Sequence, residues 1–159
     1  MLWPDADEWL RETVDESISM AQRLEHFLAQ VAPELGAKVT SLDAISGGYS
    51  RVTSVAEIQT SEGGRHKLVL RSDPPSGQGV FDSDRDTEWR LLRALWDVDA
   101  VEIARPRFYD ATGEQLGSKT IVMDHIEGTP LQLTLGPEAD GRVARSTFLN
   151  VAASLQRIH

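Results

Sequence analysis

The chain has 159 residues, of which 40% are hydrophobic, as expected for one ordinary soluble domain. Acidic residues outnumber basic ones by 25 to 16, and the net charge of −9 argues against nucleic acid as a partner. No apolar run approaches the roughly 18 residues that cross a bilayer, so no membrane partner is expected. Cysteine is absent, which excludes disulfides, thiol nucleophiles and thiolate metal sites and makes a cytoplasmic location the simplest expectation.

The first predicted element is a long helix over residues 5–31. Apolar residues recur there at intervals of three or four and form one stripe along the helix. Pro33 and Gly36 are expected to end it. The stripe consists of Trp9, Val14, Ile18, Ala21, Leu24, Leu28 and Val31.

Three short runs of β-forming residues follow, at residues 39–45, 52–59 and 67–70. The connections between them, residues 46–51 and 60–66, contain glycine pairs and are short. Connections of this length join only antiparallel neighbours, so the three runs predict a meander.

A loop at residues 73–79 leads to a second predicted helix that ends near residue 96. Two further strand-like runs follow at residues 105–109 and 119–126, with a turn over residues 110–113 between them. A linker begins at residue 127.

The last predicted element is a helix over residues 138–159. Its apolar stripe is expected to be exposed if no further domain covers it, which predicts self-association. The stripe consists of Phe148, Val151, Ala152, Leu155 and Ile158.

The glycine pair Gly47 and Gly48 lies between the first two strands and allows two interpretations. Glycine is the usual residue where a hairpin turn needs positive φ, and a plain turn is the simpler interpretation. Alternatively, backbone without side chains can close over phosphate groups, with the hydroxyls of Ser46 and Ser50 facing the anion.

Arg71 and Glu88 are candidates for an ion pair. Arg71 ends the third strand, and the alternation of side chains places it on the same face as Val69. Glu88 lies on the apolar stripe of the second helix, where an unpaired charge would be unfavourable. Its partner is either Arg85, one turn earlier in a surface pair, or Arg71 on the sheet, and we favour Arg71.

Two residue groups resemble metal ligands but are interpreted otherwise. Asp82, Asp84 and Asp86 lie at a helix start, where acidic residues cap the helix and interact favourably with its dipole. The four histidines are far apart in the sequence without the spacing of a zinc site, and His159 is expected to pack between helices.

The order of these elements and motifs resembles the N-terminal lobe of the aminoglycoside phosphotransferase family, which has a protein-kinase-like fold. The resemblance covers about residues 40–159 and implies an α+β fold: a five-stranded antiparallel sheet with one packed helix, flanked by a long N-terminal and a C-terminal helix. It implies a helical extension at residues 1–36, a small lobe at 37–127, and a linker with the first helix of a large lobe at 128–159. The motifs are Ile45-Ser-Gly-Gly-Tyr-Ser50, Leu68-Val-Leu-Arg71, Asp86-Thr-Glu88 and Ile121-Val-Met-Asp-His-Ile-Glu-Gly128.

The resemblance also implies a nucleotide site. Arg71 stands where kinases usually carry a phosphate-binding lysine, Glu88 would position it, and Val69 would cover the base. The Asp124 carbonyl and the Ile126 N–H would bind the purine edge. The complete set of expected nucleotide-binding residues is Ser46, Gly47, Gly48, Tyr49, Ser50, Val69, Arg71, Glu88, Met123, Asp124 and Ile126.

The function implied is phosphoryl transfer by a longer parent protein, from ATP or GTP with Mg²⁺ to a hydroxyl of a small molecule. No stretch like His-Gly-Asp or Asp-Phe-Gly occurs after residue 128, so catalytic residues and metal ligands are expected in a lobe beyond this chain, and the chain alone is expected to be inactive. The alternatives are a non-catalytic, kinase-derived module for nucleotide sensing or partner docking, with the N-terminal helix as the docking surface, and an unrelated α+β binding domain.

Overall fold

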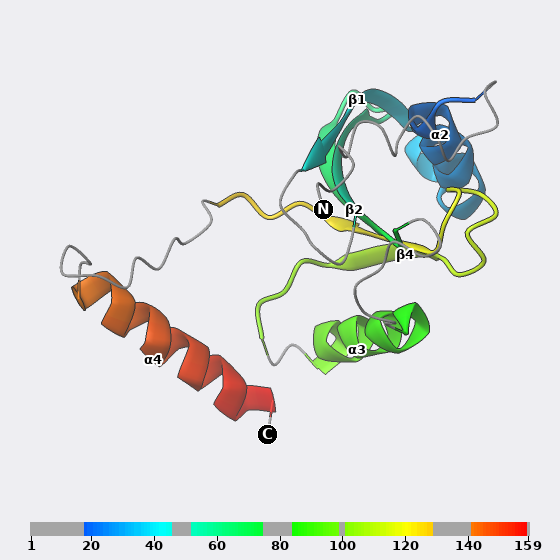
Figure 1. Ribbon diagram of the computed structural model, residues 1–159. Helices are drawn as coiled ribbons and strands as arrows, with labels where there is room; N and C mark the ends of the chain where they lie inside the picture. The colour runs from blue at the N-terminus through cyan, green and yellow to red at the C-terminus, as the bar shows by residue number, and fades with distance from the viewer. Residues whose placement is uncertain (1–17, 46–51, 75–83, 99–100, 129–140, 159) are drawn as a thin grey trace, which may run out of the picture.

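The computed structural model describes residues 18–45, 52–74, 84–98, 101–128 and 141–158. They include a five-stranded sheet with the strand order β1-β2-β3-β5-β4, in which every neighbouring pair is antiparallel (Figure 1). The predicted α+β fold and meander are therefore confirmed. The strands are β1 (Lys38–Ile45), β2 (Val52–Gln59), β3 (Arg65–Ser72), β4 (Pro106–Asp110) and β5 (Thr120–Asp124).

Helix α2 (Met20–Val31) begins later than predicted. The backbone of Ser19 is extended, with ψ of 156°, so one continuous helix over residues 5–31 is wrong. The reason is a capping box: the Gln22 N–H donates to the Ser19 hydroxyl, and the Ser19 N–H donates to the Gln22 side chain. These bonds satisfy N–H groups that a helix start leaves without partners. Residues 1–17 lie outside the described residues.

The helix ends where the sequence predicted. A short 3₁₀ helix, η1 (Pro33–Leu35), follows, and Gly36 adopts the left-handed conformation that glycine tolerates best.

Helix α2 packs against one face of the sheet (Figure 1). Its buried side chains Leu24, Phe27 and Leu28 are at most 1% exposed. The division expected from the sequence placed this helix in an N-terminal extension, residues 1–36, outside the small lobe. In the structure the helix shares one hydrophobic core with the strands. The strand and loop residues of this core are Ala56, Ile58, Leu68, Leu70, Leu116 and Val122.

Helix α3 (Arg85–Val98) contacts the opposite face of the sheet, the one that carries Arg71. Leu68 and Leu70 are buried on the α2 face, so the alternating residues of β3 face α3. Asp84 caps the helix by accepting hydrogen bonds from the N–H groups of Asp86 and Thr87, which confirms its predicted role. Asp82 lies outside the described residues.

The predicted turn between β4 and β5 is organised by Asp110, which is 4% exposed. Its carboxylate accepts the N–H groups of Gly113, Gln115 and Leu116 at 2.9, 3.0 and 2.8 Å. One buried side chain thus binds three backbone N–H groups of the loop, which are not hydrogen-bonded to a neighbouring strand.

Helix α4 (Gly141–Ile158) confirms the final predicted helix, with a start a few residues later. Leu149 and Val151 are exposed, whereas the side chains of Phe148, Leu155 and Ile158 lie outside those described. Self-association through this helix stays a prediction. Among the described residues, no helix combines the length and apolar character needed to cross a bilayer.

Candidate functional site

Arg71 and Glu88 form the ion pair that the sequence predicted. The Nη1 atom of Arg71 lies 2.8 Å from Oε1 of Glu88, and their side chains are 36% and 22% exposed. Arg71 comes from the end of β3 and Glu88 from the first half of α3. The pair therefore joins the helix to the sheet face opposite the main core.

Arg85, the other candidate partner, also binds Glu88. Its Nη1 donates to Oε2 of Glu88 at 2.8 Å, so each carboxylate oxygen of Glu88 contacts a different guanidinium. The sequence interpretation treated an Arg85–Glu88 contact as a surface pair, and this was wrong because the Arg85 side chain is 0% exposed. It lies in the first turn of α3, where it is enclosed against the sheet.

Asp73 completes this cluster, although the sequence pattern did not predict a role for it. Its Oδ1 accepts from Nε and Nη2 of Arg85, at 3.1 and 2.6 Å. The available signal was its position, directly after the strand that ends with Arg71 and Ser72. We refer to Arg71, Asp73, Arg85 and Glu88 as the four-residue cluster.

The charges of the four-residue cluster balance, with two guanidiniums and two carboxylates. Arg85 is enclosed and makes three hydrogen bonds, so its charge is compensated inside the protein. Arg71 is the cation of the cluster that keeps substantial exposure. A guanidinium in this position can bind a carboxylate or phosphate oxygen through parallel N–H donors.

An apolar row lies next to Arg71 on the same face. Val55, Val69 and Met123 are paired across β2, β3 and β5, two positions along the strands from the row that contains Arg71. Rows of this kind are about 7 Å apart. The half-buried Val55 and Val69 thus lie beside a cation, whereas Met123, the next residue of the row, is buried.

A second set of contacts fixes the orientation of α3. Asp86 accepts from the Tyr109 hydroxyl and from Nζ of Lys119, both at 2.8 Å. Trp89 stacks on Tyr109 with 5.5 Å between ring centroids. The Lys119 hydrogen bond, followed by that of Tyr109, lowers the pKa of Asp86. Burial, followed by the Asp86 hydrogen bond, raises the pKa of Tyr109, which keeps the phenol a donor.

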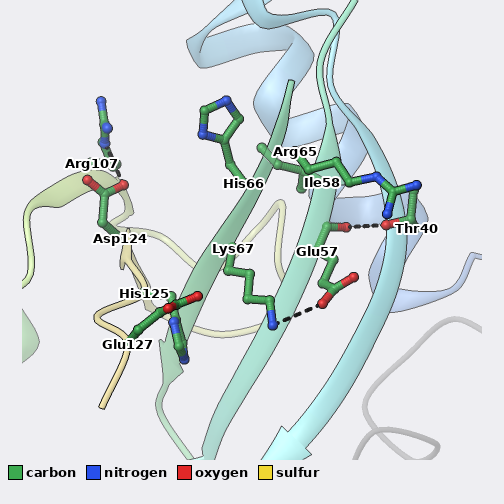
Figure 2. A pocket seen from close by; sticks show the side chains of 10 residues that line it. All are labelled: Thr40, Glu57, Ile58, Arg65, His66, Lys67, Arg107, Asp124, His125 and Glu127. Atoms are coloured by element: carbon green, nitrogen blue, oxygen red, sulfur yellow. Dashed lines mark hydrogen bonds and ion pairs between the residues drawn. The ribbon is translucent and has the colours of Figure 1, made fainter. Parts of the chain in front are cut away.

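A hollow of about 530 Å³ lies at the opposite end of β3 from Arg71. Figure 2 shows Lys67 directed toward Glu57, and Arg107 beside Asp124. Each is an ion pair: Nζ of Lys67 lies 3.1 Å from Oε1 of Glu57, and Nε of Arg107 lies 2.7 Å from Oδ1 of Asp124. Of the expected nucleotide-binding residues that the structure describes, Asp124 alone lines it. The hollow is open and its charges are largely paired, so it is a weaker candidate than the face around Arg71.

The segment expected to bind the purine, residues 124–126, follows β5 and runs beside β3. The N–H of Asp124 donates to Arg105, and that of His125 donates to Lys67, at 2.9 and 3.1 Å. Ile126 is exposed, and Met123, at 7% exposure, is packed as expected.

The structure brings only part of the expected set together. Val69, Arg71, Glu88 and Met123 belong to one face, because their strands pair in register and α3 reaches Arg71. The glycine turn, residues 46–50, lies outside the described residues. Among the described residues, no group of three or more His, Cys, Asp or Glu side chains is arranged to hold a metal ion.

Five antiparallel strands in this order, with one helix joined by an ion pair to the third strand, form a small lobe of the protein-kinase-like type. No protein-family model matches the chain, and no curated protein sequence matches it. Among the solved structures that match the chain is one from Ralstonia eutropha JMP134, described as "a putative aminoglycoside phosphotransferase". The TM-score is 0.52 and the sequence identity 20%, over 73% of this chain and 30% of that one. This likeness shows the fold, and the chain spans about 30% of the length of that protein.

Proposed function

We propose that this chain is the nucleotide-binding part of a kinase-like phosphotransferase that acts on a hydroxyl group of a small molecule. The observation that carries the proposal is the 2.8 Å ion pair between Arg71 and Glu88 on the sheet face beside the apolar row. The fold likeness to a protein described as "a putative aminoglycoside phosphotransferase" supports the same class.

In this proposal Arg71 binds a phosphate oxygen of ATP or GTP, and Glu88 holds the guanidinium in place. The arrangement corresponds to the cation–carboxylate pair with which kinases orient the nucleotide phosphates. Arginine replaces the usual lysine and offers a planar, permanently charged group with several donors. The apolar row of Val55, Val69 and Met123 is expected to contact the base.

The phosphoryl transfer itself is assigned to a longer protein. Such transfer depends on positioning and on metal ions that neutralise the developing charge, and Mg²⁺ would supply that charge when bound with the nucleotide. We expect its protein ligands outside this chain. The 159-residue chain should therefore bind nucleotide without turning it over.

Calorimetric titration with ADP and ATP in the presence of Mg²⁺ tests the binding step. Arg71→Ala should weaken binding by roughly tenfold to a hundredfold, since hydrogen bonds to charged groups contribute about 1.5–3 kcal/mol. Arg65→Ala is the matched control, because Arg65 is an exposed arginine on the same strand and the same face. Binding that is unaffected by Arg71→Ala, or affected equally by both changes, would contradict the assignment of Arg71.

A further inference from the structure

A pocket of about 210 Å³ lies on the face of the sheet against which α2 packs, opposite the face that carries Arg71. Its apolar lining consists of Leu35, Ile58, Leu68 and Phe108. Ile58 and Leu68 are 3% and 4% exposed and belong to the core shared with α2. The pocket adjoins the larger hollow of Figure 2, because several residues line both. It is therefore an apolar recess beside a wider, charged opening.

A bulge in β4 brings a charged residue to this pocket. Pro106 pairs with Met123. Phe108 pairs with Val122, the adjacent residue of β5, so Arg107 is an additional residue on β4. In a regular strand Arg107 and Phe108 would face opposite sides of the sheet. The bulge interrupts this alternation and both side chains line the pocket, which places a guanidinium beside an aromatic ring.

The polar side of the pocket is formed by Arg107, Asp124 and His66. Nε of Arg107 donates to Oδ1 of Asp124 at 2.7 Å, and the two side chains are 39% and 33% exposed. A guanidinium carries five N–H donors, so this bond leaves donors for a second acceptor. Figure 2 shows the His66 ring on the side of β3 where Arg107 and Asp124 lie, and an imidazole supplies a further N–H donor.

The apolar part of the pocket suits an aromatic ring. Phe108 already packs edge-on against Phe27 of α2, with 6.3 Å between ring centroids and an angle of 86° between the planes. Aromatic rings favour such arrangements, and a third ring against Phe108 would extend the pair. A cavity of about 150 Å³ with an apolar lining is large enough to bind benzene. The pocket, at about 210 Å³, therefore has room for one ring with a small substituent.

We propose that this pocket binds a small aromatic carboxylate, with its ring against Phe108 and its carboxylate on Arg107 and His66. Two side chains that donate N–H groups face one internal carboxylate, Asp124, which favours an anionic over a cationic substituent. This site lies on the face of the sheet opposite Arg71 and does not depend on the proposed nucleotide site.

Titrations of the 159-residue chain, followed by the NMR shifts of its amide groups, measure the binding. The probe is benzoate, with an expected dissociation constant on the order of 1 mM for a ligand of this size. Benzamide keeps the ring without the charge, benzylamine replaces the anion by a cation, and acetate keeps the carboxylate without the ring. Benzoate should bind more tightly than each of these by roughly fivefold or more and should shift the amide signals of Leu68 and Phe108.

Variants identify the groups that bind benzoate. Arg107→Met should weaken benzoate binding by about tenfold and leave benzamide binding unchanged. Arg105→Met is the matched control, because Arg105 is an exposed arginine two residues earlier whose guanidinium lies over Trp96. Arg107→Lys keeps the charge without the planar fork and should weaken binding less, which provides a second measurement if Arg107→Met does not fold. Leu35→Trp should fill the recess and abolish binding of both benzoate and benzamide.

Each outcome supports or overturns the proposal. Preferential binding of benzoate that depends on Arg107 and is blocked by Leu35→Trp supports it. Equal binding of acetate or benzamide, or tighter binding of benzylamine, overturns it, as does the absence of saturation at millimolar benzoate. Equal losses in the Arg107 and Arg105 variants, or shifts around Arg71 in place of those at Leu68 and Phe108, also overturn it. None of these measurements involves a nucleotide, so failure here leaves the proposed function untouched, and failure of ADP to bind leaves this site untouched.

Discussion

The hydroxyl of Tyr109 lies 2.8 Å from the carboxylate of Asp86, and this hydrogen bond attaches the first turn of α3 to the edge strand β4. Asp86 also contacts Lys119, so one acidic residue joins the helix to β4 and to the residue just before β5. The helix that carries Glu88 is therefore oriented by contacts that do not involve Arg71.

The Asp86 contacts predict a pH dependence of stability. Because the folded state lowers the pKa of Asp86, its contribution is fully present above the unfolded value of 3.8 and is lost as the pH falls through the lower folded value. Asp86→Asn should destabilise the protein near neutral pH, and its difference from the wild type should shrink below pH 3.8. Urea unfolding over this range measures the difference.

The control for this prediction is Glu102→Gln, which removes one exposed negative charge elsewhere. A difference in the free energy of unfolding between Asp86→Asn and the wild type that stays constant into the acid range would contradict the prediction.

At basic pH, the hydrogen bond from Lys119 to Asp86 raises the pKa of Lys119. The contribution of the lysine to stability is therefore present below pH 10.5 and is lost as the pH rises through the higher folded value.

The packing of α2 predicts that this helix is required for a stable sheet. Leu24 is 0% exposed and belongs to the core formed with β2, β3 and β5. Leu24→Ala should lower the free energy of unfolding by about 3 kcal/mol, through lost burial and the cavity left behind. Leu91→Ala is the matched control, because Leu91 is 57% exposed and its truncation should change stability by less than about 0.5 kcal/mol. Equal losses in denaturant unfolding would show that α2 does not contribute to the core as described.

Different effects are predicted at two glycines that both have positive φ, Gly113 in the β4–β5 loop and Gly63 in the β2–β3 connection. Gly113 has φ of 74°, and an added Cβ would lie 2.7 Å from the carbonyl carbon of Ser118. Gly63 has φ of 84°, but no atom lies within 4 Å of the corresponding Cβ position. Gly63→Ala should therefore cost only the conformational term of about 1–2 kcal/mol.

Gly113→Ala should cost that term plus about 1–3 kcal/mol for moving the Ser118 backbone. Thermal or denaturant unfolding of the two variants measures the gap between them. Equal destabilisation would mean that the loop adjusts freely and that Asp110 does not hold it in one conformation.

Most elements were predictable because they depend on neighbours in the sequence. The alternation in β3, the short connection with its glycine pair between β2 and β3, and the Asp84 cap all act over a few residues, and each appears as predicted. The false prediction of a continuous N-terminal helix shows the limit. The apolar stripe passes through Ser19, although the capping pair of Ser19 and Gln22 was recognisable in the sequence.

The ion pair of Arg71 and Glu88 was within reach of sequence reasoning because each residue lies on a predictable face of a predictable element. Burial of Arg85 and recruitment of Asp73 were not, because they depend on where the end of β3 meets the start of α3. The position of the start of α3 relative to the end of β3 is set by strand register and helix placement. Both arise from packing among residues far apart in the chain. Local pattern therefore determined the elements and their faces, whereas tertiary packing decided which charges share a carboxylate.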